Sequence, residues 1–199
     1  MSRLEQVLCK AYDDLHRNQV PVALVGGLAV SAYGEPRFTR DADFAAYVAN
    51  DRDAETLIHS LQGNGYQVLA VVEQQVQKRL ATVRLATRGI ESEQVVVDLL
   101  FASSGIEREI TMEAQTLEIF PQFSLPVARI GHLLALKILC RDDRRRPQDI
   151  ADLRNLLKVA DAEETQLAIE ALYLIEQRGF GREKDLQGAW QALLREKAE

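Results

Sequence analysis

One acidic residue interrupts the most apolar strand pattern in the chain. The run VVVDLLF, residues 95–101, has the composition of an ordinary buried strand except for Asp98 at its centre. A carboxylate in such a place needs a partner, because burying an unpaired charge is very costly. The fold must therefore supply this strand with a cation, with a basic side chain such as arginine, or with a proton.

Two further acids, Asp41 and Asp43, are separated by a single alanine. Residues 38–48 alternate well enough to predict a strand, which places both carboxylates on one face. If this strand lies beside residues 94–101, Asp98 comes within about 5 Å of one of them. Like charges about 6 Å apart repel by roughly 3 kcal/mol at an effective dielectric constant near 20, so such a cluster requires protonation or a cation. This interpretation requires Asp98 to face the pair and to have no arginine partner.

The chemistry of these residues favours a metal-dependent reaction on nucleotides. Carboxylate oxygens suit Mg²⁺ or Mn²⁺, and shared carboxylates can hold two ions for in-line displacement at phosphorus. Gly26 and Gly27 follow a predicted strand at 22–25 and precede a helical stretch. Glycine permits close backbone approach, and the amides at a helix N-terminus attract phosphate oxygens. The glycine turn therefore fits the same chemistry.

The apolar pattern changes from strands to helices near Pro126. Strands are predicted at 22–25, 38–48, 66–72, 80–86, 94–101 and 116–120, and the third to fifth resemble an antiparallel meander. Helices are predicted at 3–17, 28–33, 51–61, 130–138, 147–157, 167–175 and 186–194. Pro121 and Pro126 indicate a crossing segment. We expect an α/β region at 1–126, which would carry the candidate acids and the glycine turn, and a helical region at 127–199.

The composition of the chain is typical of a globular protein without disulfides or membrane-spanning segments. A hydrophobic content of 47% supports a globular chain, and a net charge of -6 means that any RNA contact needs a local basic patch. Cys9 and Cys140 are far apart in sequence and fit reduced thiols rather than a disulfide scaffold. The sequence has no signal-peptide pattern and no apolar run of about 20 residues. We therefore expect a cytoplasmic protein with no membrane partner.

Taken together, these motifs resemble the DNA polymerase beta-like nucleotidyltransferase superfamily. The stretch AVSAYGEPRFTRDADF, residues 29–44, is similar to its abortive-infection (AbiEii) toxin branch. The resemblance extends to HLLALKILCRDDRRRPQDIADLRNLL, residues 132–157, which resembles that branch's lysine helix and Arg-x-x-Asp-x-x-Asp segment. It implies an α+β fold, in which a mixed sheet flanked by helices is followed by a C-terminal helical bundle.

The resemblance also implies an activity and its residues. The activity is magnesium-dependent transfer of a nucleoside monophosphate from a nucleoside triphosphate (NTP) to a hydroxyl of a tRNA or a protein, in a system with an antitoxin or toxin partner. Asp41 and Asp43 would hold both metal ions, and Asp98 would bind the catalytic ion and draw the proton from the attacking hydroxyl. Gly26 and Gly27 would hold the triphosphate.

Four more residues are candidates for nucleotide binding. Lys137 lies on an apolar helical stripe, either pointing towards phosphate in the cleft or extending to the surface. The resemblance gives Asp149 a supporting role, although acids near a helix start are also favoured by the helix dipole. Arg37 and Arg40 are the nearest candidates for further phosphate contacts, with an exposed position as the alternative for one of them.

A second hypothesis follows from one departure from the superfamily pattern. Many members carry Gly-Ser where this chain has Gly26-Gly27, so a phosphate-binding hydroxyl is missing. The chain would then be a catalytically inactive module that binds metal and nucleotide, or a partner protein. A third hypothesis is transfer to a small molecule such as an aminoglycoside.

Overall fold

A computed structural model describes residues 2–34, 39–87, 95–142 and 148–198. The strands are β1 (Val22–Val25), β2 (Asp41–Ala46), β3 (Tyr66–Gln74), β4 (Arg79–Thr87), β5 (Val96–Leu100), β6 (Gln115–Phe120) and β7 (Phe123–Val127). The helices are α1 (Arg3–Arg17), α2 (Gly26–Tyr33), α3 (Asp51–Gly63), α4 (Glu107–Met112), α5 (Ile130–Cys140), α6 (Gln148–Val159), α7 (Ala162–Gln177) and α8 (Leu186–Ala198). This arrangement confirms the predicted α+β class.

Within the described residues the strands form one seven-stranded mixed sheet in the order β3-β4-β5-β2-β1-β7-β6. The strands β3, β4 and β5 pair antiparallel, which confirms the predicted meander. Strand β5 then pairs in parallel with β2, and in this register Asp43 lies opposite Asp98. The two acidic strands predicted to be neighbours are therefore hydrogen-bonded to one another.

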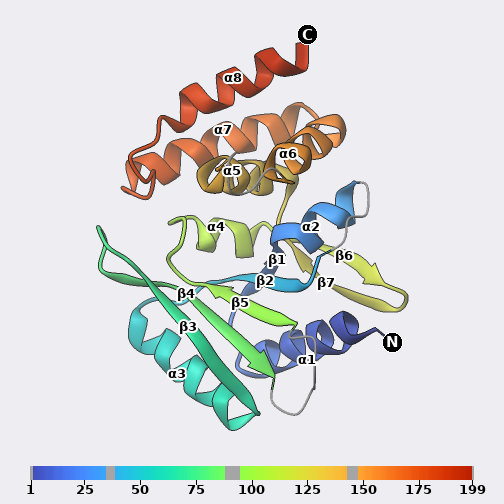
Figure 1. The fold of residues 1–199 in the computed structure, drawn as a ribbon, viewed down its shortest axis with the longest axis vertical. Helices are drawn as coiled ribbons and strands as arrows, with labels where there is room; N and C mark the ends of the chain where they lie inside the picture. Colours follow the sequence, from blue (N-terminus) through green and yellow to red (C-terminus); the bar gives the residue numbers. More distant parts are fainter. Residues whose placement is uncertain (1, 35–38, 88–94, 143–147, 199) are drawn as a thin grey trace.

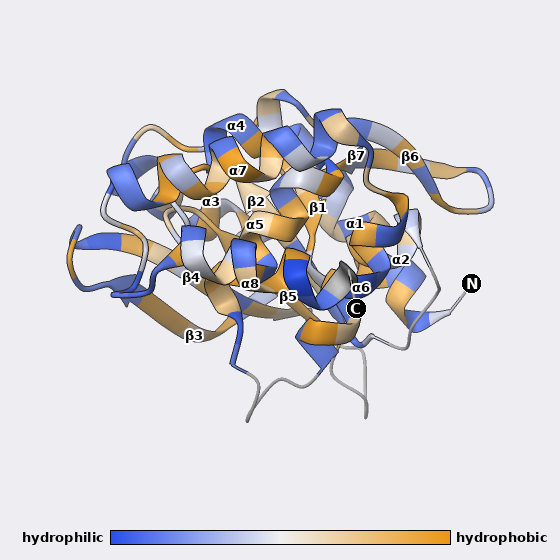
Figure 2. Ribbon diagram, turned by 90° about the horizontal axis from the view of Figure 1, so that it is seen from above, coloured by the Kyte–Doolittle hydropathy of each residue, from blue (hydrophilic) through white to orange (hydrophobic). Residues whose placement is uncertain are grey.

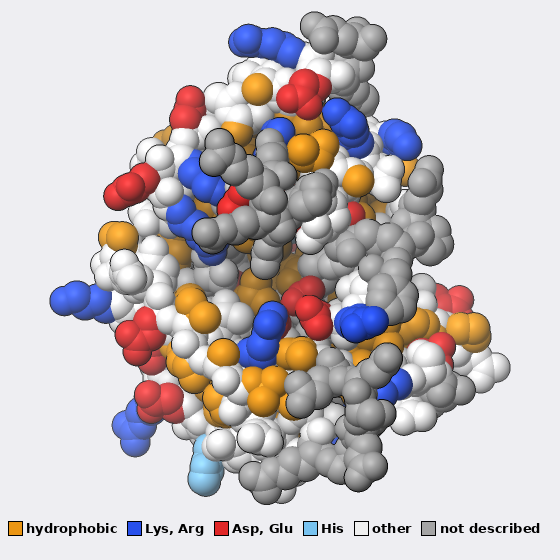
Figure 3. All heavy atoms as spheres, in the orientation of Figure 1, with side chains coloured by type: hydrophobic (Ala, Val, Ile, Leu, Met, Phe, Trp, Pro, Cys, Tyr) orange, Lys and Arg blue, Asp and Glu red, His pale blue; other side chains and the backbone are white. Residues whose placement is uncertain are grey.

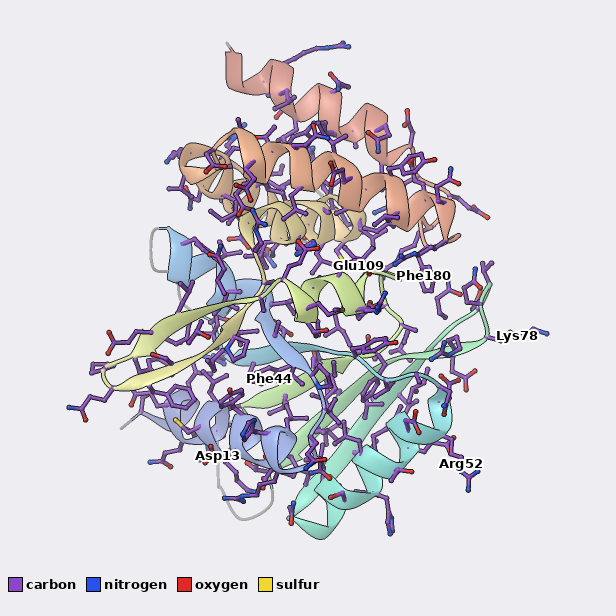
Figure 4. All side chains as sticks on the ribbon, turned by 180° about the vertical axis from the view of Figure 1, so that it is seen from behind. Asp13, Phe44, Arg52, Lys78, Glu109 and Phe180 are labelled. Atoms are coloured by element: carbon purple, nitrogen blue, oxygen red, sulfur yellow. The ribbon has the colours of Figure 1, made fainter. Side chains whose placement is uncertain are left out.

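Helices cover both faces of the sheet (Figure 1). Helices α1 and α3 lie on one face and α2 and α4 on the other, with α5 to α8 stacked beyond α2 and α4. Because side chains alternate along a strand, Ala42 and Phe44 of β2 point away from the face that carries Asp41 and Asp43. Both apolar residues are fully buried, and Figure 4 shows Phe44 on the side of the sheet that α1 covers.

Two elements were missed by the sequence analysis. The prediction that Pro121 and Pro126 mark a crossing segment is wrong for residues 123–127, which form β7. Strand β7 pairs along its length with β6, where Pro126 lies opposite Thr116, but its other edge pairs with β1 only at Leu24↔Val127, so that edge needs few backbone donors and a proline is tolerated. The short helix α4 is held by Glu107, whose buried carboxylate accepts hydrogen bonds from the backbone of Ser103 and Ser104.

Helix α5 is buried over most of its surface, which explains why nearly all of its residues are apolar (Figure 2). The Glu164 carboxylate of α7 caps its first turn, accepting hydrogen bonds from the Gly131 backbone N–H (2.7 Å) and from Arg129 Nε (2.9 Å). Apolar side chains of the sheet and of the helical part belong to one continuous core. The position of α5 is therefore set by both parts of the chain.

A second contact joins the helical part to α4. The Arg178 guanidinium donates to both carboxylate oxygens of Glu109, at 2.9 and 2.8 Å, and to the Gly105 carbonyl oxygen at 2.5 Å. Glu109 and Phe180 lie at this junction (Figure 4), and Phe180 packs where Gly105 leaves room for its ring. None of the described helices is both long enough and apolar enough to cross a bilayer.

Replacing Gly131 with alanine should destabilise the contact between α5 and α7. A Cβ at this position would lie 2.6 Å from the Glu164 carbonyl oxygen and 2.7 Å from Leu167 Cβ. We expect Gly131→Ala to lower the free energy of unfolding by about 1–3 kcal/mol, measured by urea denaturation. Gly63→Ala is the matched control, because a Cβ on Gly63 meets no atom of the described chain within 4 Å. Equal stabilities of the two variants would contradict this account.

Candidate active site

A cavity lies between the sheet and the helical part, at the start of α2. It is lined by Gly26 and Gly27 of α2, Asp41 and Asp43 of β2, Asp98 of β5, Lys137 of α5 and Asp149 of α6. These seven residues are all sequence-predicted candidates, and they come from five different elements. Figure 3 shows acidic and basic side chains side by side on this face, below the helical layer.

The remaining two candidates do not line this cavity in the described structure. Arg40 directly precedes β2, but it is not among the lining residues, so its predicted phosphate contact stays a prediction. Arg37 lies outside the described residues.

The first condition of the metal interpretation is met, because Asp98 faces the pair. Asp43 and Asp98 are opposite each other on parallel neighbouring strands, and Asp41 lies two residues away on the same face. Burial, and then the negative charges of Asp98 and Asp41, raise the pKa of Asp43 to about 7. The charges of Lys137 and Arg84 act in the opposite direction but do not offset this rise. Negative charge therefore remains undercompensated at Asp43.

The second condition is not met, because Asp98 has an arginine partner. Arg84 of β4 lies opposite Asp98 in the antiparallel register, and its guanidinium donates from Nε to Oδ1 (2.9 Å) and from Nη2 to Oδ2 (2.6 Å). The ion pair raises the pKa of Arg84. The charge of Asp98 is thus explained without a metal, so the argument that three acids must share a cation is wrong, and the argument from repulsion is left to Asp41 and Asp43.

Arg84 is the residue that sequence reasoning missed at this site. It stands at a polar position of the alternating stretch A-T-V-R-L in the strand predicted at 80–86, and pairing that strand with residues 94–101 in the observed register brings it opposite Asp98. Among the residues that the structure describes, no three His, Cys, Asp or Glu side chains are grouped so that they could hold one metal ion.

Gly26 has a close structural relation to Asp43. Its φ of +67° is a conformation that favours glycine, and a Cβ on Gly26 would overlap the Asp43 carboxylate. The turn from β1 into α2 therefore needs glycine both for its backbone conformation and to leave room for the acid. The N-cap residue of α2 is Val25, which provides no side-chain hydrogen bond, and this leaves the first amides of the helix for other acceptors.

Lys137 points into the protein, as one of its two predicted alternatives stated. Its Nζ lies 2.8 Å from Asp149 Oδ1 and 2.7 Å from Asp152 Oδ2, and both aspartates are almost fully buried. The Asp149 Oδ2 atom is buried and has no hydrogen-bond partner among the described residues. Two acids facing one lysine position its ammonium group at the cavity wall and hold α6 against α5.

Replacing Gly26 with alanine should destabilise the protein in two ways, through backbone strain and through overlap of the new Cβ with Asp43. Gly65 has a φ of +90°, and its Cβ position meets no described atom within 4 Å, so Gly65→Ala measures strain without overlap. We expect Gly26→Ala to lower the free energy of unfolding by at least about 1 kcal/mol more than Gly65→Ala, measured by urea denaturation. A smaller effect at Gly26 would show that Asp43 does not occupy this space.

Asp43 should make stability depend on pH. Its pKa is raised to about 7 from an ordinary value of 3.8, so between these values the folded state holds a proton that the unfolded state has lost. The free energy of unfolding should therefore fall as pH rises from about 4 to about 7, and then level off.

The variant Asp43→Asn removes this dependence. It should gain stability over the unmodified chain as pH rises from about 4 to about 8, by a few kcal/mol at most, in urea denaturation with EDTA present. Asp13→Asn, at an exposed acid of α1, is the control and should show no such gain. A stability difference that stays constant across this pH range would contradict the proposed titration.

Comparisons with solved structures support the fold. The chain is similar to an antigenic nucleotidyltransferase-like protein from Paracoccidioides brasiliensis, with 21% identity, a TM-score of 0.54, and 95% of this chain and 92% of that one covered. It is also similar to the lincosamide antibiotic adenylyltransferase LnuA bound to lincomycin (16% identity, TM-score 0.48, 78% and 98% covered). The antibiotic-resistance factor ANT(2'')-Ia gives 14% identity, a TM-score of 0.49, and 97% and 92% covered. Only the first neighbour has a TM-score above 0.5, and it supports the fold alone.

A search of curated protein sequences finds no match. The model of one protein family does match, over residues 7–198, and its description is "Nucleotidyl transferase AbiEii toxin, Type IV TA system". This match spans nearly the whole chain and includes every candidate residue of the cavity. The chain therefore belongs to the AbiEii nucleotidyltransferase toxin family, and it is a nucleotidyltransferase.

Proposed function

We propose that this enzyme transfers a nucleoside monophosphate from an NTP to a hydroxyl of a tRNA or a protein, and that the reaction depends on Mg²⁺ or Mn²⁺. The observation that carries the proposal is the meeting of Asp41 and Asp43 with the glycine turn of α2 in one cavity, across from Lys137. The carboxylates that would bind a cation therefore lie beside the backbone amides of α2 that would bind a phosphate. Family membership supports the reaction type.

The residues present fit a divalent cation in their chemistry. Asp41 and Asp43 offer carboxylate oxygens on one face, which suit Mg²⁺ or Mn²⁺. Burial, and then the charges of Asp98 and Asp41, raise the pKa of Asp43, and a bound cation would favour the ionised carboxylate against both causes. Asp41 and Asp43 would hold the ion, and Asp98, the third ligand that the sequence predicts, would have to give up Arg84 to join them. When bound, the cation would neutralise phosphate charge and orient the reacting groups.

The other lining residues would bind and orient the triphosphate. The amides at the start of α2, beginning with Gly26 and Gly27, would donate to phosphate oxygens. Lys137 would add a positive charge on the opposite wall, while Asp149 keeps its ammonium group in place. Arg40 would offer a further contact from the segment before β2. The serine hydroxyl that many superfamily members carry at this turn is absent here, and Lys137 would be the side chain that contacts phosphate.

The reaction would proceed by direct displacement at the α-phosphorus. A bond forms between the acceptor oxygen and the α-phosphorus, and the bond from that phosphorus to the oxygen bridging to the β-phosphorus breaks. Pyrophosphate leaves with the electron pair of the broken bond. The proton of the attacking hydroxyl passes to the Asp98 carboxylate, which stands beside Asp43 at the cavity floor.

We further propose that the enzyme acts in the cytoplasm as the toxin of a toxin–antitoxin pair, so that its partners are an NTP, an RNA or protein acceptor, and an antitoxin. The support is the family description, which names a toxin of a type IV system. The average surface is acidic, with a net charge of -6, so an RNA acceptor would be guided by local basic side chains near the cavity.

Labelled-transfer assays test the reaction. The full chain is incubated with each labelled NTP, with Mg²⁺ or Mn²⁺, and with either total tRNA or cell extract. We expect labelled RNA or protein together with pyrophosphate, and at least about a 100-fold lower rate for Asp41→Asn or when EDTA replaces the metal. Asp13→Asn serves as the matched control and should retain the full rate. Transfer that persists undiminished in Asp41→Asn, or no transfer with any NTP and acceptor, would refute the proposal.

A further inference from the structure

The ion pair between Arg84 and Asp98 is unequal in its exposure to solvent. The Asp98 side chain is 11% exposed, whereas the Arg84 side chain is 46% exposed. Both carboxylate oxygens of Asp98 accept from the guanidinium. The acid is therefore fixed in the sheet and needs a cation, while the arginine can leave towards solvent without losing much buried surface.

The position of this ion pair makes Arg84 a competitor of any metal in the cavity. Arg84 lines the same cavity as Asp41, Asp43 and Asp98. A divalent cation held by Asp41 and Asp43 would repel the guanidinium and attract the neighbouring Asp98 carboxylate. The guanidinium fork that matches a carboxylate also matches a phosphate. A triphosphate in the cavity would therefore give Arg84 a second place to bind.

We propose that Arg84 is a displaceable counter-ion: it holds Asp98 in the metal-free protein, gives up this carboxylate to the divalent cation, and then pairs with the triphosphate. The inference rests on the proposed function, since it assigns a positioning role at the same site. It implies that metal alone binds weakly, because only the molecules in which Arg84 has left Asp98 offer this carboxylate to a metal beside Asp43. Metal and nucleotide would strengthen each other's binding.

Metal affinity without nucleotide tests this role. Mn²⁺ binding to the full chain is titrated by electron paramagnetic resonance for the unmodified chain, Arg84→Gln and Arg79→Gln. Arg79 is the matched control, because it lies on the same strand and pairs with Asp51 (2.6 Å), and neither residue lines the cavity. We expect Arg84→Gln to bind Mn²⁺ at least about tenfold more tightly, and Arg79→Gln to bind it as the unmodified chain does. A purely structural ion pair would leave the affinity unchanged or weaker in Arg84→Gln.

A measurement on the unmodified chain covers the case in which Arg84→Gln does not fold. The ¹⁵N Nε–H resonance of Arg84, assigned by its loss in Arg84→Lys, should shift when Mg²⁺ and an NTP saturate the protein. A resonance that stays in place at saturation would overturn the inference.

The outcomes also separate the inference from the proposed function. If Mn²⁺ binds and Asp43→Asn abolishes binding, but Arg84→Gln has no effect, the counter-ion role is refuted and the metal-dependent reaction stands. If neither the unmodified chain nor Arg84→Gln binds Mn²⁺ without nucleotide, the counter-ion role is refuted, and the labelled-transfer assay decides the metal-dependent reaction.

Discussion

The parallel pairing of β2 with β5 is the constraint on which the cavity depends. It aligns Asp43 with Asp98 on one face of the sheet, so that like charges are brought together in a poorly hydrated place. Two features reduce this repulsion. Arg84 of the next strand pairs with Asp98, and the raised pKa of Asp43 favours its protonated, uncharged form. The arrangement costs stability in the metal-free protein, which is typical of sites built to bind a cation.

The second wall of the cavity depends on how α5 is held. This helix is buried over most of its surface, its first turn is capped by Glu164, and Gly131 lets α7 approach closely. Lys137 is consequently fixed along its stem, and Asp149 and Asp152 fix its ammonium group. The ammonium group is thereby held by α6 at the lining of the cavity.

Much of the fold and site was accessible from the sequence, since it rests on local patterns. The spacing of apolar residues predicts α1 and β1 with their observed bounds. The acid inside an apolar strand indicates that Asp98 needs a charged neighbour, which led to its predicted place beside Asp43. Strand β7 was missed because Pro126 is unfavourable in a strand. The proline is tolerated on the edge that faces β1, where the two strands pair only at Leu24↔Val127. The role of Arg84 depends on a register between two strands, which no local pattern specifies. Nor does any local pattern show that a side chain at position 26 would overlap the Asp43 carboxylate.

The cavity is assembled from segments made at very different times during synthesis. Its floor comes from β2 and β5, while Lys137 and Asp149 emerge from the ribosome only when most of the chain has been translated. A nascent or truncated chain that ends before α6 therefore has acids without the opposing lysine clamp. The site is therefore complete only after the helical part has docked against the sheet.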